Sequence, residues 1–380
     1  MKVQSRLPDV GTSIFTVMSR MALDYGAINL SQGFPDFAID NKIIDLVHRF
    51  MLEGHNQYAP MLGMPALRSI ISEVIQRSFN NVVDPETEIT ITSGATEAIY
   101  AAIAAFITPG DEVIVFDPSY DSYNPVVRLN GGTPVHINLR YPDFSVDWDL
   151  VRSKITRRTK MIIVNTPHNP SGSILNEADL KELESIALQH NILVLSDEAY
   201  ERLIFDDNIH QSVLRYPGLA SQSLAVFSFG KTFHATGWKM GYVVAPGFLM
   251  EEIRKTHQFI VFSVNTPIQL ALAEYLKTPE HYESLGAFYQ KKRDFFLQEM
   301  NGSSFEPLAC KGSYFQIMSY QNVARKPEVE MAEELTKKFK VAAIPVSVFY
   351  QDKTDHNILR FCFAKKEETL EKACAILRTI

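Results

Sequence analysis

The chain has 380 residues, of which 46% are hydrophobic and 21% charged, a composition typical of a soluble globular protein with one large core and room for a second domain. Its 37 basic and 44 acidic residues are interspersed and leave a net charge of -7, so we expect no nucleic-acid partner. The three cysteines lack metal-ligand spacing, the first residues lack the apolar segment of a signal peptide, and no apolar run is long enough to span a membrane. We therefore expect a cytoplasmic protein with no bound metal and no membrane partner.

The segments from residue 88 onward alternate between apolar strands and amphipathic helices. The first unit predicts a strand that ends at Ser93, a largely buried helix that Gly110 stops, and a strand over 112–116. The next unit predicts a strand over 160–167, a helix over 176–190, and a further strand directly after it. This alternation predicts an α/β fold whose large domain has a mostly parallel sheet flanked by helices.

The C-terminal part of the chain changes in character after an apolar helix around 266–276. A long amphipathic helix near 280–300, short strands in "GSYFQIM" and "NILRFCF", and a closing helix near 366–378 follow. We therefore predict a large domain over 43–276. A smaller α/β domain is expected over 277–380, completed by residues 1–42.

The stretch "SFGKTFHATGWKMGY" (228–242) places Lys231 directly after an apolar strand. A Walker phosphate loop is disfavoured, because Ala225 stands where that loop needs a glycine. Two interpretations remain, an ordinary solvated surface cation and an amine that performs covalent chemistry. Apolar neighbours disfavour the charged form of an amine, and the uncharged amine is a nucleophile that can form a Schiff base.

Polar motifs also stand at the carboxyl ends of the other predicted strands, where doubly wound sheets bind their ligands. They are "SGAT" (93–96), "NTPHNPSG" (165–172) and "SDEAY" (196–200). The helix N-terminus after "SG", with its free backbone amides, predicts an anion site, to which Ser228 and Lys239 could add a donor and a charge.

Each of these residues also has a purely structural interpretation. Asp197 could be a helix cap, Asn169 a turn residue before proline, and Tyr200 a packing residue. Their occurrence together, at successive strand ends and with one amine among them, favours a single shared site.

These motifs resemble those of the fold-type I, pyridoxal-phosphate-dependent aminotransferases of the class I/II group. The resemblance covers nearly the whole chain in the family's order and approximate spacing, through "SQGFPDF", "YAPMLGMPALR", "SGATEAIY", "NTPHNPSG", "SDEAY", "SFGKTFHATGWKMGY" and "LRFCF". Within that group the chain is most similar to the methionine and kynurenine/glutamine-type aminotransferases. The resemblance implies pyridoxal 5'-phosphate as the cofactor.

The resemblance also implies a role for each matched residue around the cofactor ring. Lys231 would carry the cofactor as a Schiff base and move the proton at the substrate Cα. Asp197 would pair with the pyridine nitrogen and keep it protonated. Tyr200 and Asn169 would hydrogen-bond the ring oxygen, and Tyr120 would stack on the ring face, with a buried core tyrosine as the alternative.

For the cofactor phosphate, the resemblance implies binding by the turn at Ala95 and Thr96, by Ser228 and by Lys239. Many relatives have arginine at the last position, and a lysine keeps the charge but loses the bidentate fork. Tyr58 matches a tyrosine that reaches the phosphate from a second subunit. The resemblance therefore implies a homodimer with shared sites.

For the substrate, the resemblance implies that Arg360 clamps the α-carboxylate through two parallel hydrogen bonds. Asn169 and the backbone near Gly33 would assist, and Tyr58 and Tyr120 would contact the substrate as well. A surface or interdomain salt bridge is the alternative interpretation of Arg360.

The expected walls of the side-chain pocket are apolar or aromatic and include Phe15, Phe34 and Phe349. A carboxylate side chain would lose its hydration there without a partner, unless an unmatched cation such as Arg20 or Arg254 entered the site. We therefore expect transfer of the amino group of a neutral sulfur-containing, amide or aromatic amino acid (methionine, glutamine, kynurenine or phenylalanine) to a 2-oxo acid.

Two other classes of protein share the same motifs. A cysteine-conjugate C–S β-lyase, or a racemase, also removes the Cα proton and differs only in the fate of the carbanion. A non-catalytic, cofactor-binding regulator would need an added DNA-binding module or lack the lysine, and the chain shows neither.

Overall fold

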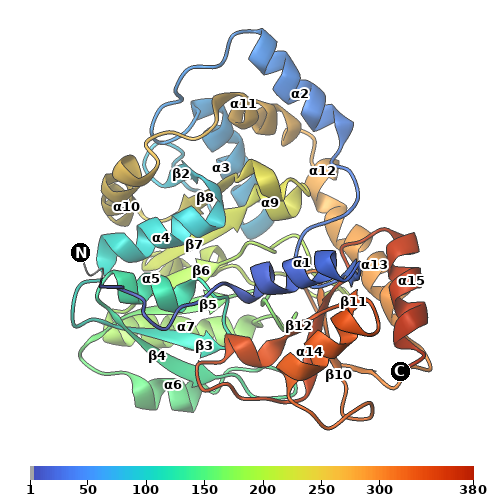
Figure 1. Cartoon of the computed structure of the whole chain (residues 1–380). Helices are drawn as coiled ribbons and strands as arrows, with labels where there is room; N and C mark the ends of the chain where they lie inside the picture. Colours follow the sequence, from blue (N-terminus) through green and yellow to red (C-terminus); the bar gives the residue numbers. More distant parts are fainter. Residues whose placement is uncertain (1–3) are drawn as a thin grey trace.

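The computed structural model describes residues 4–380 and is built around a seven-stranded sheet (Figure 1). In chain order the strands are β2 (Ile89–Thr92), β3 (Glu112–Asp117), β4 (Thr133–Asn138), β5 (Thr159–Asn165), β6 (Leu193–Asp197), β7 (Ser223–Ser228) and β8 (Gly241–Val244). Their order in the sheet is β2-β8-β7-β6-β5-β3-β4. β8 runs antiparallel to β2 and β7, and the other adjacent strands pair in parallel, so the predicted α/β class with a mostly parallel sheet is confirmed.

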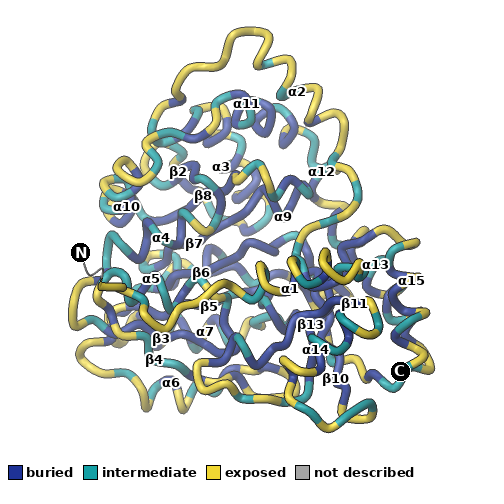
Figure 2. The backbone as a smooth tube through the Cα atoms, in the orientation of Figure 1, coloured by how far each residue is buried: buried dark blue, intermediate teal, exposed yellow. Residues whose placement is uncertain are grey.

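Helices cover both faces of this sheet. They are α2 (Asn41–Leu52), α3 (Pro65–Phe79), α4 (Gly94–Phe106), α5 (Tyr123–Leu129), α6 (Trp148–Lys154), α7 (Glu177–His190), α8 (Pro217–Ala220), α9 (Phe229–Thr232), α10 (Gly247–Ile260) and α11 (Thr266–Tyr275). Side chains alternate along each strand, so that in β5 Met161 and Ile163 face the core under α4, α5 and α10. Ile162 and Val164 face the core under α3, α7 and α11. Figure 2 shows the resulting buried sheet and the exposed outer loops.

The boundaries of two helices test the sequence signals directly. α7 begins as predicted, because the Asn176 side chain accepts hydrogen bonds from the Ala178 and Asp179 amides and the Asp179 side chain accepts one from the Asn176 backbone amide. α4 ends earlier than its predicted stop at Gly110. Ile107 is already extended, and Pro109 disfavours helical backbone in the residue before it.

A second, antiparallel sheet has the order β12-β13-β10-β9 and is formed by C-terminal residues. β1 pairs in parallel with β11, so N-terminal and C-terminal segments lie side by side. This pairing agrees with a small domain made from both ends of the chain, whose boundaries at 1–42 and 277–380 remain a prediction. The strands are β1 (Ile28–Asn29), β9 (Glu306–Pro307), β10 (Phe315–Ser319), β11 (Val341–Ala342), β12 (Ile344–Pro345) and β13 (Ile358–Cys362).

The helices of this part are α1 (Ile14–Asp24), α12 (Glu280–Glu283), α13 (Leu285–Glu299), α14 (Glu328–Lys337) and α15 (Glu367–Leu377). The single helix predicted near 280–300 is thus divided, with a break at Ser284 between α12 and α13. Within residues 4–380, no helix has the length and apolar character needed to cross a membrane.

Candidate active site

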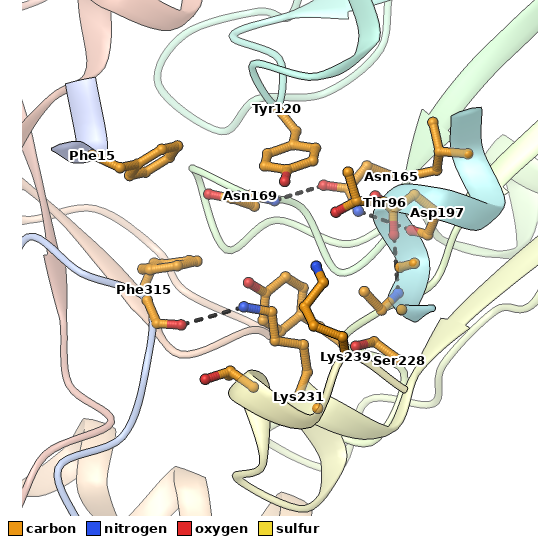
Figure 3. A pocket seen from close by; sticks show the side chains of 18 of the residues that line it. Phe15, Thr96, Tyr120, Asn165, Asn169, Asp197, Ser228, Lys231, Lys239 and Phe315 are labelled. Atoms are coloured by element: carbon orange, nitrogen blue, oxygen red, sulfur yellow. Dashed lines mark hydrogen bonds between the residues drawn. The ribbon is translucent and has the colours of Figure 1, made fainter. Parts of the chain in front are cut away.

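A cavity of about 310 Å³ lies at the carboxyl ends of β5, β6 and β7 and at the N-terminus of α4 (Figure 3). Phe15 of α1, Phe315 of β10 and Arg360 of β13 complete its wall from the other sheet. Parallel strands deliver their terminal side chains to one edge, which is why residues far apart in sequence meet here. Every residue predicted to bind the cofactor or the substrate α-carboxylate lines this cavity, except Tyr58: Gly33, Ala95, Thr96, Tyr120, Asn169, Asp197, Tyr200, Ser228, Lys231, Lys239 and Arg360.

Lys231 projects into the cavity from α9, the single helical turn that follows β7. Its Nζ lies 3.0 Å from the Tyr314 hydroxyl and 3.3 Å from the Gly33 carbonyl oxygen. Burial lowers the pKa of this amine to about 8, and the nearby cations Arg360 and Lys239 act in the same direction. About a tenth of the amine is therefore uncharged at pH 7, far more than for an ordinary lysine, and the uncharged form is the one that a nucleophile or base requires.

Asp197 ends β6 and is buried beside the cavity. One carboxylate oxygen accepts a 2.6 Å hydrogen bond from the Tyr123 hydroxyl, and the other accepts a 3.2 Å bond from the Ala199 amide. Burial raises the pKa of Asp197, while these two bonds oppose that rise. The Asn165 side chain donates to the Asp197 carbonyl oxygen at 2.8 Å, so the backbone at the strand end is fixed as well.

Arg360 is fully buried in the middle of β13. Its guanidinium donates to Asn169 Oδ1 at 2.6 Å and to the Ser31 carbonyl oxygen at 2.9 Å, and it lies 3.8 Å from the centroid of the Phe315 ring. Burial lowers its pKa to about 10, which leaves the side chain protonated at neutral pH. Its Nε has no hydrogen-bond partner among residues 4–380, so this buried cation keeps donor capacity for a ligand.

Another part of the cavity wall is formed by groups that bind anions. Ala95 and Thr96 lie in the first turn of α4, whose first residue, Gly94, has a positive φ of 78°. A Cβ built on that glycine would lie 3.5 Å from Lys239 Nζ, so the cation sits directly beside the helix start. Ser228 adds a hydroxyl from the end of β7. Helix amides, a hydroxyl and an ammonium group together form a suitable phosphate site.

Tyr58 is the exception among the predicted site residues. It is 82% exposed and does not line the cavity of its own chain. Its ring packs edge-to-face on Phe262, with ring centroids 5.4 Å apart. Its predicted contribution to a second subunit therefore remains a prediction.

Several residues at the cavity were not singled out from the sequence. Asn165 stands at the start of the quoted motif "NTPHNPSG", and its place at a strand end was the available signal. Tyr314 and Phe315 belong to "GSYFQIM", where aromatic residues in a short strand give no sign of a site. Tyr123 is fully buried, and only the fold reveals its contact with Asp197.

A family model for aminotransferase class I and II matches residues 25–377 of the chain. The chain belongs to this aminotransferase family. It is 48% identical over 378 residues to the methionine aminotransferase of Escherichia coli, covering 99% of this chain and 98% of that protein. It is 32% identical to kynurenine–oxoglutarate transaminase 3 of the rat, covering 100% of this chain and 90% of that protein.

The structure of this aminotransferase also matches the crystal structure of YbdL from Escherichia coli, described as having a methionine aminotransferase function. The TM-score is 0.98 and the sequences are 48% identical, and each chain is covered completely. These findings confirm the family, the fold and the aminotransferase class of enzyme that the sequence motifs predicted.

Proposed function

We propose that this enzyme uses pyridoxal 5'-phosphate to move the amino group of a neutral amino acid, with methionine foremost, to a 2-oxo acid. The observation that carries the proposal is a buried amine, Lys231, placed in one cavity with a carboxylate, an anion-binding turn and the guanidinium of Arg360. The similarity to methionine and kynurenine aminotransferases supports the class of donor.

The residues present fit the proposed cofactor. Each oxygen of Asp197 accepts one hydrogen bond in the structure, and an ionised carboxylate can accept more, so it can pair with a protonated ring nitrogen. Tyr120 supplies an aromatic face, while Tyr200 and Asn169 supply polar groups for the ring oxygen. When bound, the cofactor supplies an aldehyde that joins to amines and a ring that takes up electrons.

The side chains of the protein have separate roles in proton transfer and in substrate binding. We assign to the Lys231 amine the transfer of the proton at the substrate Cα, because its lowered pKa lets it both accept and return a proton near neutral pH. Tyr314 and the Gly33 carbonyl hold Nζ in place. Arg360 binds the substrate α-carboxylate, and its bonds to Asn169 and Ser31 fix its orientation.

The charge inventory of the cavity favours a neutral side chain. Among the described residues, the cations that line it are Lys231, Lys239 and Arg360, and each already has a proposed partner. Arg20 pairs with Asp24 on the surface, and Arg254 binds Thr90 and nearby carbonyl groups, so neither lines the cavity. A second carboxylate on the substrate would lack a partner within this chain.

The aromatic residues expected around the substrate side chain are only partly found there. Phe15 and Tyr120 line the cavity. Phe349 lies behind it, packed against Phe15 at a centroid distance of 5.8 Å. Phe34 does not line it, because its ring is half exposed beside Lys365. We propose that a partner subunit supplies the remaining wall.

We further propose a homodimer in which Tyr58 of each subunit reaches the phosphate site of the other. Tyr58, Phe259 and Phe262 present exposed aromatic surface that a partner would cover. The three cysteines are unpaired and buried, which supports the proposed cytoplasmic location.

Half-reaction spectroscopy tests this proposal. Amino acids are added one at a time to the purified enzyme without an acceptor, and conversion of the bound cofactor to pyridoxamine phosphate is followed by absorbance. We expect efficient conversion by methionine, and by glutamine, phenylalanine or kynurenine, with kcat/KM far lower for aspartate. A preference for aspartate would overturn the assignment, and release of pyruvate from cysteine conjugates without amino transfer would favour a β-lyase.

A further inference from the structure

A buried ionisable pair, His257 and Glu97, lies directly behind the anion-binding turn and has no part in the chemistry proposed above. His257 belongs to α10 and Glu97 to the first turn of α4, and both side chains are more than nine-tenths buried. His257 Nδ1 lies 2.9 Å from Glu97 Oε1, and Nε2 lies 3.2 Å from the Met61 carbonyl oxygen. The other carboxylate oxygen accepts a 3.0 Å hydrogen bond from the Ser93 amide.

This geometry fixes the number of protons on the pair. A backbone carbonyl can only accept a hydrogen bond, so Nε2 carries a hydrogen that it donates to Met61. Between Nδ1 and the Glu97 carboxylate a second proton is required, since two unprotonated acceptors would repel each other at 2.9 Å. Whether that proton sits on His257 or on Glu97, the pair as a whole is electrically neutral.

The neutrality of the pair affects anion binding, because Glu97 directly follows the proposed phosphate-binding turn in the chain. Ala95 and Thr96, one helical turn away at most, form the turn that we assign to the cofactor phosphate. An uncompensated carboxylate there would repel a phosphate dianion through a poorly solvated interior, and it would compete for the partial positive charge of the helix start. With the shared proton in place, Glu97 instead caps the Ser93 amide and leaves the following amides to the anion.

We propose that His257 is a positioning residue for the cofactor phosphate, because the proton it shares with Glu97 keeps the N-terminus of α4 able to hold a doubly charged anion. The inference rests on the proposed function, since it concerns the same phosphate site. It adds to that function a residue that does not touch the cavity and acts only through Glu97.

His257 has two contacts, one with Glu97 and one with the Met61 carbonyl oxygen, and an experiment must distinguish their effects. Met61 lies in the same segment as Tyr58. The hydroxyl groups of Ser263 and Thr266 donate hydrogen bonds to two other carbonyl oxygens of this segment, those of residues 59 and 57. Loss of His257 could therefore also disturb this segment. A glutamine at position 257 keeps an N–H near the place of Nε2 and removes only the proton shared with Glu97.

The experiment compares the dissociation constants of pyridoxal phosphate and of pyridoxal, which lacks the phosphate, for the full chain freed of cofactor. We expect His257→Gln to weaken pyridoxal phosphate binding about tenfold or more and pyridoxal binding less than about twofold, because only the phosphate feels the unpaired carboxylate. The double variant with Glu97→Gln carries no unpaired charge, and we expect it to restore the binding of pyridoxal phosphate. If His257→Gln does not fold, His257→Asn, which removes the shared proton and also the bond to Met61, is compared with and without Glu97→Gln, so that only the charge at residue 97 differs.

His190→Gln, on the exposed end of α7, is the matched control and should change neither constant. Equal loss of affinity for both ligands, or failure of Glu97→Gln to restore phosphate binding, would overturn the inference and leave His257 as a structural support. Failure of the wild-type chain to bind pyridoxal phosphate would instead overturn the proposed function itself, so the two failures are distinguishable.

Discussion

Burial of one amine sets the pH at which the candidate site can react. The pKa of Lys231 falls from an ordinary value of 10.5 to about 8, chiefly because the charged form loses its hydration. Below that pKa the amine is protonated and has no free electron pair, and above it the amine is reactive. We expect covalent capture of pyridoxal phosphate by the cofactor-free enzyme, trapped by borohydride, to rise with pH around a midpoint near 8. A midpoint near 10.5 would show that Lys231 is solvated.

Removal of that amine gives the most direct prediction for the site. Lys231→Ala should leave a folded protein that still binds the cofactor without a covalent bond, because the phosphate and ring contacts remain. Loss of a positioned acid–base group should reduce kcat by at least ~10²–10⁴-fold. Circular dichroism would verify the fold, and the half-reaction with methionine would measure the loss. Wild-type transamination by this variant would contradict the assignment.

Tyr314 offers a finer test, because its hydroxyl lies between Lys231 Nζ and the Gly33 carbonyl oxygen. Tyr314→Phe removes that hydroxyl but keeps the ring. We expect kcat to fall about five- to tenfold, the effect of one hydrogen bond, with KM for methionine nearly unchanged. Tyr320→Phe is the matched control, since it also removes a buried hydroxyl that donates to a carbonyl but lies away from the cavity. A change confined to KM would place Tyr314 in substrate binding instead.

At the scale of elements, β8 is packed against the turn that opens α4. A Cβ at Gly241 would lie 2.6 Å from the Phe227 carbonyl oxygen and 2.9 Å from the Ala95 amide nitrogen, closer than real contacts allow. Gly241→Ala should therefore cost about 1–3 kcal/mol of unfolding free energy and weaken pyridoxal phosphate binding as the turn shifts. Urea unfolding and cofactor titration measure the two effects. Gly247→Ala is the control, because its Cβ would meet Thr87 at an ordinary 3.6 Å.

The secondary-structure elements show which features of the fold could be predicted from the sequence. The predicted strands β3 and β5 and the helix α7 are found, because apolar runs and a capping asparagine are local signals. The antiparallel direction of β8 was not predicted, since direction depends on how the chain returns from α9 and not on the composition of the strand. The division of the helix near 280–300 also escaped prediction, because Ser284 carries no strong stop signal.

In the site, too, residues in local motifs could be predicted from the sequence, and residues that act through distant contacts could not. Lys231, Asp197 and Asn169 stand in motifs whose residue types and positions at strand ends are visible in the sequence. Tyr314 and Tyr123 contact residues that are distant in the sequence, so no local motif predicts their place at the site.

At the scale of the whole molecule, the proposed homodimer can be tested by subunit exchange. We expect Lys231→Ala subunits to be inactive and Tyr58→Phe subunits to be weakened. If Tyr58 serves the partner's site, a mixed dimer has one site that carries neither defect. We expect the activity of the mixture to exceed the sum of the separate parents after exchange.

Each variant incubated alone under the same conditions is the control for that experiment. A sedimentation analysis of the wild-type enzyme shows whether exchange is possible at all. A fully active monomer, or a mixture with no gain in activity, would contradict a site shared between subunits.

The pairing of β1 with β11 has a consequence for synthesis on the ribosome. Ile28 emerges early, yet its partner Val341 belongs to one of the last strands to be made. The seven-stranded sheet, with Asp197 and the strand before Lys231, is complete once Val244 has emerged, long before Arg360. The nascent chain can therefore form the part of the cavity that contains Asp197 and Lys231 first. The edge of β1 stays unpaired until β11 has been synthesised.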